Sequence, residues 1–87
     1  EEEVYNAFIF ALTDTKSAEH IQIAKIQLFL DMGITLNRLW KGKTPLIYAA
    51  KHGNSTKVLD LLMKNGAKPG IQDTKGKTAF DYAKENI

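Results

Sequence analysis

The feature that most constrains this chain is an internal repeat. Residues 42–49 and 76–83 both begin with Gly-Lys-Thr and both end in Tyr-Ala, at a constant displacement of 34 residues. Residues 25–33 and 58–66 align at a displacement of 33, and each is an apolar run that ends on glycine. Periods of this length are typical of arrays of small units that stack on one another. The chain is therefore expected to fold as a repeat protein.

The central unit has the sequence signals of a helix pair. Thr44 is a suitable N-cap, and Pro45 suits the first helical position because its missing N–H would have no partner there. This helix should end at Gly53. A second apolar run, residues 58–63, is followed by Gly66, which can adopt the left-handed conformation that closes a helix. We expect two antiparallel helices joined by a tight turn.

Three further helices are expected from the apolar patterns, at residues 4–12, 21–32 and 78–86. The connection at 13–20 gives the first unit five more residues between its helices than the central unit has. Ser17 is a plausible N-cap within it. The insertion is either a harmless extension or a recognition loop, since insertions in repeat proteins fall in loops on one side.

The repeated positions resemble the ankyrin repeat family, whose unit of about 33 residues opens with a Thr-Pro-Leu-His-x-Ala pattern. The resemblance covers residues 4–86 and implies an all-α fold, an ankyrin-type solenoid of stacked antiparallel helix pairs joined by hairpin-like finger loops. It divides a single domain, 1–87, into repeats at 4–37 and 38–71 and a half-repeat at 72–87. The matching positions are Thr44, Pro45, Leu46, Ile47, Tyr48, Ala49, Ala50, Gly53, Leu61, Leu62, Gly66, Ala67, Asp73 and Gly76.

The third unit lacks its second helix in this alignment. Because about three repeats are usually needed for stability, the domain is expected to be marginal by itself. Three alternatives stay open: the end units compensate, the chain comes from a longer array, or a partner completes it.

Composition excludes several classes of protein. With no cysteine among its 87 residues, the chain has neither disulfides nor thiolate metal ligands. The longest apolar stretch, residues 7–12, is too short to cross a bilayer, and no signal-peptide pattern is present. We expect no membrane insertion and favour the cytoplasm. An exported or processed form is left open because the chain begins with Glu rather than Met.

No arrangement of residues predicts an enzyme. His20 and His52 are the two histidines and are expected in different inter-helix turns, which argues against a shared metal. Ser17 and Ser55 are expected in helix-capping turns rather than in a strand-turn-helix elbow, and no glycine-rich phosphate motif occurs. Asp73 is expected to accept hydrogen bonds within a turn rather than to act in catalysis. We therefore expect no catalytic residue, metal, cofactor or small-molecule substrate.

Charge is divided unevenly along the chain. Residues 1–36 carry a formal charge of −4 and residues 37–87 carry +6. Such asymmetry can guide encounter with charged partners, although most surface charge on small domains only maintains solubility. An acidic partner surface is therefore the narrower of two expectations, and ordinary solvation is the other.

The resemblance implies that a partner protein contacts the finger loops and the exposed side of the first helix of each repeat, which form a concave face. Lysines about one repeat apart would form rows on it, pairing Lys41 with Lys75, Lys43 with Lys77 and Lys51 with Lys84. The candidate partner-binding residues are Arg38, Leu39, Trp40, Lys41, Lys43, Lys51, His52, Thr74, Lys75, Lys77 and Lys84.

Trp40 is the single tryptophan, and it lies in a segment expected to protrude. It is either a binding anchor, since tryptophan is enriched in interface hot spots, or a packing residue folded back on the neighbouring helix. The sequence does not separate these two roles.

A non-enzymatic protein-binding module is the expected function. It would be a recognition domain of a larger protein or, alternatively, a stand-alone inhibitor of the immunity-protein type that blocks a toxin or enzyme. Nucleic-acid binding by the basic C-terminal half is a second alternative, which the shortage of interleaved aromatic residues disfavours.

Overall fold

The computed structural model describes residues 2–14, 16–52 and 56–85. Its elements, in chain order, are α1 (Glu2–Thr13), α2 (Glu19–Asp31), α3 (Pro45–Lys51), α4 (Thr56–Lys64) and α5 (Ala79–Glu85). Within these residues the regular structure is helical, and the one β-type pairing is an isolated bridge between Trp40 and Lys43. The all-α prediction is confirmed.

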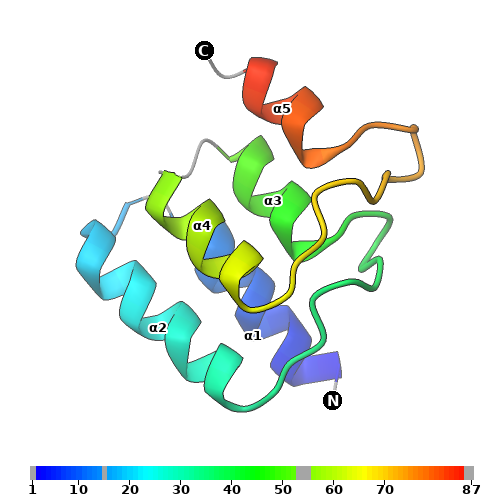
Figure 1. Cartoon of the computed structure of the whole chain (residues 1–87). Coiled ribbons are helices and arrows are strands. Elements are labelled where there is room, and N and C mark those ends of the chain that lie inside the picture. The colour runs from blue at the N-terminus through cyan, green and yellow to red at the C-terminus, as the bar shows by residue number, and fades with distance from the viewer. Residues whose placement is uncertain (1, 15, 53–55, 86–87) are drawn as a thin grey trace.

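The helices form two rows (Figure 1). In the first row, α3 packs between α1 and α5. In the second, α2 packs on α1 and α4 packs on α3, which gives two helix pairs. Two long connections, residues 32–44 and 65–78, extend from the same side of these pairs and correspond to the expected fingers.

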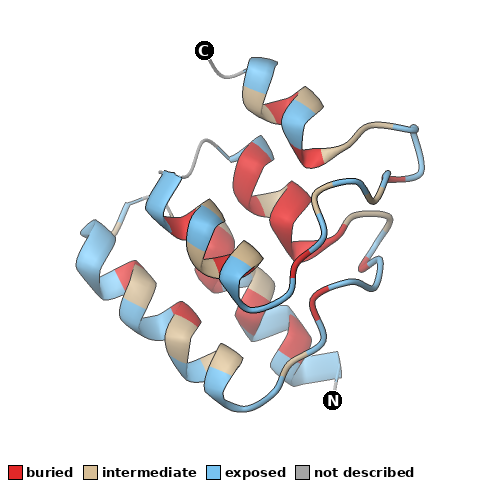
Figure 2. Cartoon of the chain, in the orientation of Figure 1, coloured by how far each residue is buried: buried red, intermediate tan, exposed pale blue. Residues whose placement is uncertain are grey.

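The core lies between the rows, and α3 is buried along most of its length (Figure 2). Leu46, Ile47, Ala49 and Ala50 are all at most 3% exposed, because α3 is covered by its neighbours on several sides. The core is completed from the other helices by the buried side chains of Phe8, Leu12, Ile26, Val58, Leu62 and Tyr82.

The sequence signals of the central unit have their expected roles. Thr44 is the N-cap of α3, and its Oγ1 accepts a hydrogen bond from the Ile47 N–H at 3.2 Å. Pro45 is the first residue of the helix. The helix ends at Lys51 with His52 as its C-cap, and the expected stop at Gly53 lies outside the described residues. After α4, Gly66 has φ of +101°, the left-handed conformation expected at a helix end.

Two expectations about the first repeat are wrong. The N-cap of α2 is Ala18, without a side-chain hydrogen bond, and Ser17 lies one residue earlier, where its hydroxyl and its N–H both donate to the Asp14 carboxylate. The Ser17 hydroxyl also helps hold the pKa of Asp14 below its usual value. His20 lies within α2 rather than in a turn, since the helix begins at Glu19.

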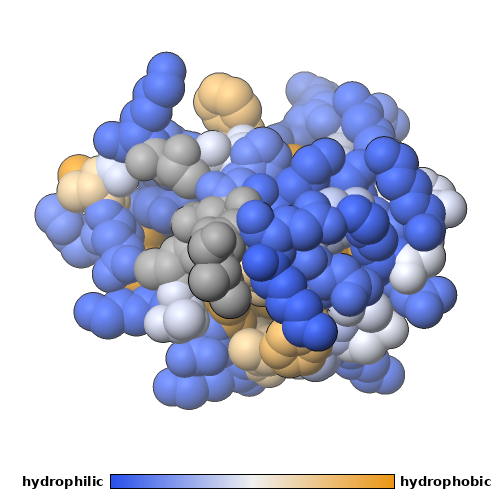
Figure 3. Space-filling model, turned by 90° about the horizontal axis from the view of Figure 1, so that it is seen from above, coloured by the Kyte–Doolittle hydropathy of each residue, from blue (hydrophilic) through white to orange (hydrophobic). Residues whose placement is uncertain are grey.

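The two ends of the stack carry exposed apolar side chains. At the α1–α2 end, Phe10, Leu28 and Met32 are between 65 and 78% exposed. At the other end α5 packs on α3, and Phe80 is 59% exposed. The view from above shows separate hydrophobic patches within a mostly hydrophilic surface (Figure 3).

Candidate partner-binding surface

The tip of the first finger is a tight hairpin turn. Trp40 and Lys43 exchange two backbone hydrogen bonds, of 2.7 and 3.1 Å. Between them Lys41 and Gly42 both have positive φ, of +50° and +89°. Positive φ at both central residues is the mark of a type I′ turn, which suits a two-residue hairpin. The turn places Lys41 at the tip of the finger, where its side chain is exposed.

The two fingers are joined side by side. The Thr74 N–H donates to the Gly42 carbonyl at 3.2 Å. A side chain at residue 42 would approach Thr74 Oγ1 to 3.1 Å, so the close contact favours glycine. Asn37 forms a second link, donating to the Gly66 carbonyl at 3.0 Å and accepting from the Lys68 N–H at 2.8 Å. The fingers therefore form one continuous surface.

Trp40 is a packing residue. Its side chain is 8% exposed, and its ring lies 5.3 Å from the Tyr5 ring, centroid to centroid. The turn folds the ring back onto α1, which is the second of the two roles that the sequence left open. This burial argues against Trp40 as a binding anchor, because a partner would have little of the ring to contact.

Three tyrosines tether the first row of helices to the fingers. Tyr5 of α1 donates its hydroxyl to the Thr35 carbonyl at 2.9 Å, and Tyr48 of α3 donates to the Trp40 carbonyl at 2.7 Å. Burial raises the pKa of Tyr5 to about 12 and also raises that of Tyr48. Tyr82 of α5 donates to the Asp73 carboxylate, and this bond raises the pKa of Tyr82 to about 12.

Asp73 organises the second finger. Its Oδ1 accepts the N–H groups of Lys75 and Lys77 at 2.8 and 2.9 Å, while Oδ2 accepts the Tyr82 hydroxyl. The Tyr82 bond, followed by the two N–H bonds, lowers the pKa of Asp73 to about 2. The prediction that Asp73 accepts turn hydrogen bonds is confirmed.

Cationic side chains lie over these aromatic rings. The Arg38 guanidinium carbon is 5.0 Å from the Tyr5 centroid and 5.8 Å from that of Trp40, and the Lys41 ammonium is 5.9 Å from Trp40. Along the same face, Lys43 lies over Tyr48 at 6.0 Å, while Lys51 and Lys77 lie over Tyr82 at 5.9 and 5.2 Å. Contacts of this length are attractive because the face of an aromatic ring is electronegative.

Two lysines that the sequence had placed in different rows lie over one ring: Lys51 and Lys77 both contact Tyr82. The Lys77 ammonium also bonds the Glu85 carboxylate at 2.6 Å, which raises the pKa of Lys77. The other candidates are exposed: Leu39, His52, Thr74, Lys75 and Lys84.

The tyrosines are the main residues of this surface that the sequence analysis did not select. Tyr48 and Tyr82 occupy equivalent positions of the aligned stretches, 34 residues apart. That spacing was a usable signal, because two tyrosines in register on neighbouring units must lie on the same side of the stack. Tyr5 has no such signal, since it is outside the aligned positions.

The described residues contain no cluster of three or more histidines, aspartates or glutamates that could hold a metal ion. Among the described helices, none has the length and apolar character required to cross a membrane.

Comparison with known proteins agrees with this architecture. A family model for ankyrin repeats in three copies matches residues 7–86. The chain is also similar to the ARF GTPase-activating proteins GIT2 of Mus musculus and Homo sapiens, with 49% identity over 45 residues. Similarity to GIT1 of Homo sapiens is 47% over the same length. Each match covers 52% of this chain. The matched stretch spans only 6% of the length of these curated relatives.

Ankyrin repeats are generally non-enzymatic modules that bind other proteins. The predicted resemblance is confirmed by the family match, by the paired helices and by the fingers that extend from one side of them. The chain belongs to the ankyrin repeat family.

Proposed function

We propose that this domain binds a partner protein through the fingers and the adjoining concave side of α1, α3 and α5, and that the contacted surface of the partner is acidic. The main support for this proposal is the series of cationic groups held over aromatic rings along this side. We call this surface, formed by Arg38, Lys41, Lys43, Lys51, Lys75, Lys77 and Lys84, the cationic face.

Preorganisation supports the proposal. The hydroxyls of Tyr5, Tyr48 and Tyr82 fix the rings on which the cations rest, and the Thr74–Gly42 bond fixes one finger against the other. Side chains that are already ordered lose less conformational entropy when a partner binds. Complementary charge also increases the rate of encounter and selects against basic partners.

The charges available for a partner are those at the edge of this surface. Lys77 is compensated by Glu85, and Lys43 has an attractive electrostatic interaction with the Asp73 carboxylate. Lys41 and Lys75 are exposed on neighbouring fingers, and Lys84 is exposed on α5. These three lysines are the residues expected to contact acidic groups of the partner.

A role as the recognition domain of a larger protein is favoured over a stand-alone inhibitor. In the relatives the matched stretch is a small part of a long chain, at 6% of its length. Nucleic-acid binding is disfavoured because single strands are held by exposed aromatic rings. On the cationic face the rings of Trp40 and Tyr82 are only 8 and 6% exposed.

The test is affinity capture from cell lysate with three baits. One bait is the wild type, the second carries Lys41→Gln, Lys75→Gln and Lys84→Gln, and the control carries Lys16→Gln, Lys57→Gln and Lys64→Gln. Both variants lose three positive charges, but the control lysines lie on α4 and on the α1–α2 connection. Circular dichroism first establishes that all three baits are equally helical.

We expect the wild type and the control to retain the same proteins and the Lys41/Lys75/Lys84 variant to lose them. Retention should weaken as salt increases, because exposed charges are screened. Equal retention by both variants would show that the cationic face is not the contact surface. If nuclease treatment removes the captured molecules, the result supports nucleic-acid binding instead.

A further inference from the structure

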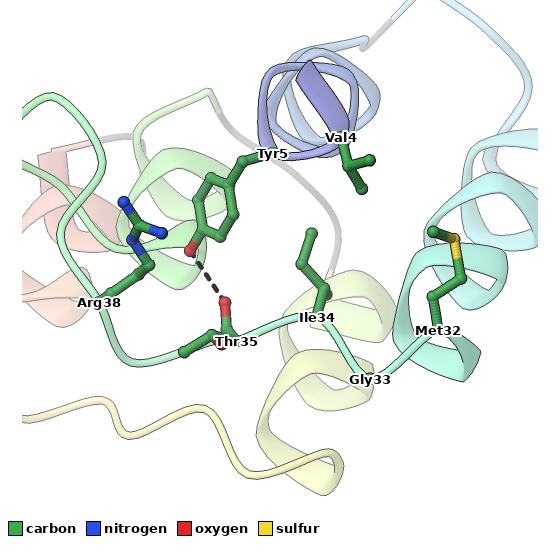
Figure 4. Close-up of a pocket in the computed structure, with 7 residues that line it drawn as sticks. All are labelled: Val4, Tyr5, Met32, Gly33, Ile34, Thr35 and Arg38. Carbon is green, nitrogen blue, oxygen red and sulfur yellow. Dashed lines mark hydrogen bonds between the residues drawn. The ribbon is translucent and has the colours of Figure 1, made fainter. Parts of the chain in front are cut away.

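A small cleft opens where α1 meets the beginning of the first finger (Figure 4). Its volume is about 250 Å³. Tyr5 stands at its centre, with the hydroxyl bonded to the Thr35 carbonyl at 2.9 Å (Figure 4). Arg38 lies on one side of the Tyr5 ring, and Val4 and Ile34 lie on the other. The cleft therefore has a cationic side and an apolar side.

The guanidinium of Arg38 is positioned but not neutralised. It rests on the rings of Tyr5 and Trp40, at 5.0 and 5.8 Å. In the described ranges, 2–14, 16–52 and 56–85, the ion pairs involve Lys25, Lys57 and Lys77, and no carboxylate is paired with Arg38. A guanidinium stacked on aromatic rings keeps its N–H groups in a plane that matches a carboxylate.

The apolar side of the cleft is open to solvent. Met32 at the end of α2 is 65% exposed, Val4 is 37% exposed, and Ile34 is partly buried between them. These side chains form the open apolar surface of the cleft, to which the Tyr5 ring, 3% exposed, adds little. Covering it would remove apolar area from water, which is favourable at about 25 cal/mol per Å².

We propose that this cleft binds an extended acidic segment of the partner protein, with a leucine or methionine on the apolar side and a glutamate or aspartate two residues later at Arg38. The inference rests on the proposed function and specifies the partner at one end of the cationic face. Charge complementarity selects the carboxylate, because Arg38 is the cation that borders the cleft.

The two-residue spacing follows from the position of Tyr5. Its ring separates the two sides of the cleft, so the apolar group and the carboxylate must straddle it. In an extended peptide, residues i and i+2 project from the same face at a separation of about 6.6 Å. Adjacent residues would point to opposite faces.

The experiment titrates the 87-residue chain with the capped peptide acetyl-Gly-Leu-Ser-Glu-Gly-amide while the fluorescence of Trp40 is recorded. Trp40 is the single tryptophan and lies 5.8 Å from the Arg38 guanidinium, so occupation of the cleft should change its emission. Two matched peptides replace glutamate with glutamine or leucine with alanine. A third peptide places leucine and glutamate next to each other.

We expect saturable binding of the first peptide at millimolar concentration or below. Replacement of either side chain, or adjacent placement, should weaken it. Arg38→Gln should weaken it roughly tenfold, as expected when a hydrogen bond to a charged group is lost. Lys16→Gln removes the same charge in the α1–α2 connection, beyond the far end of α1, and should leave the affinity unchanged. Met32→Ser should also weaken binding, although it leaves the charge of the cleft unchanged.

Absence of saturable binding by the wild type, or equal affinity in Arg38→Gln and Lys16→Gln, would overturn the inference. The proposed function is tested separately, by whether the variant of Lys41, Lys75 and Lys84 loses the partner in affinity capture. If that variant loses its partner while Arg38→Gln keeps it, the cationic face is the interface and this cleft is not part of it.

Discussion

Replacing Trp40 with alanine distinguishes packing from partner contact. The side chain is 8% exposed, and aromatic side chains bury about 150–250 Å² each, which at about 25 cal/mol per Å² gives an upper bound of roughly 4–6 kcal/mol. Substitution of buried tryptophan by alanine costs about 3–5 kcal/mol. The Trp40 ring packs against Tyr5 of α1 and lies outside the central core cluster. We therefore expect a loss at the lower end of this range, about 3 kcal/mol.

This loss is large for so small a domain. At 0.05–0.15 kcal/mol per residue, a chain of 87 residues has a free energy of unfolding on the order of 4–13 kcal/mol. Urea unfolding followed by far-ultraviolet circular dichroism measures the change, since it does not depend on the removed tryptophan. Trp40→Phe, which keeps a ring against Tyr5, should lose less than Trp40→Ala.

Leu39→Ala is the matched control. Leu39 precedes Trp40 in the same finger but is 43% exposed, so its truncation should cost less than about 0.5 kcal/mol. The reasoning is refuted if Trp40→Ala is no more destabilising than Leu39→Ala. Loss of partner binding by a fully stable Trp40→Ala protein would instead restore the role of binding anchor.

Three other substitutions test single features of the fold. Thr44→Ala removes the N-cap of α3 at a residue 1% exposed and should cost about 1–2 kcal/mol in urea unfolding. Lys41→Asn should stabilise the domain by a few tenths of a kcal/mol to about 0.5 kcal/mol in the same assay, because asparagine tolerates the φ of +50° better than lysine. Asp73→Asn should lower the melting temperature at pH 7 but change it little near pH 2. Because the folded-state pKa of Asp73 is about 2 and its ordinary value is 3.8, the stabilisation by the carboxylate is complete above about pH 4 and is lost as the pH falls through 2.

The features that could be predicted from the sequence depend on local chemistry. The N-cap at Thr44, the proline after it and the glycine at the end of α4 each act within one helical turn, so residue type and spacing were sufficient. The two turn bonds of Asp73 belong to the same class, because the N–H donors of Lys75 and Lys77 lie within four residues of it. The repeat period of 33–34 residues then predicted that units with these local features stack on one another.

The features that could not be predicted depend on competition or on distant partners. Ser17 has the chemistry of an N-cap, but its hydroxyl and N–H donate to Asp14, three residues earlier, and the helix is capped at the next residue instead. The packing of Trp40 depends on Tyr5, which is 35 residues earlier and outside the repeated pattern. No local property of residue 40 shows whether a partner ring from this chain or from another protein covers it.

The burial of Trp40 changes which residues can recognise a partner. The ring is withdrawn from the surface, but it still supports the Arg38 guanidinium and the Lys41 ammonium, at 5.8 and 5.9 Å. Tyr5 and Tyr82 support cations in the same way while their hydroxyls are bonded to the fingers. Aromatic side chains on this face therefore act as platforms, and the groups presented to a partner are the charges above them. Recognition by such a surface should depend strongly on salt and on the positions of acidic groups, and only at the cleft beside Tyr5 should it depend on an apolar side chain as well.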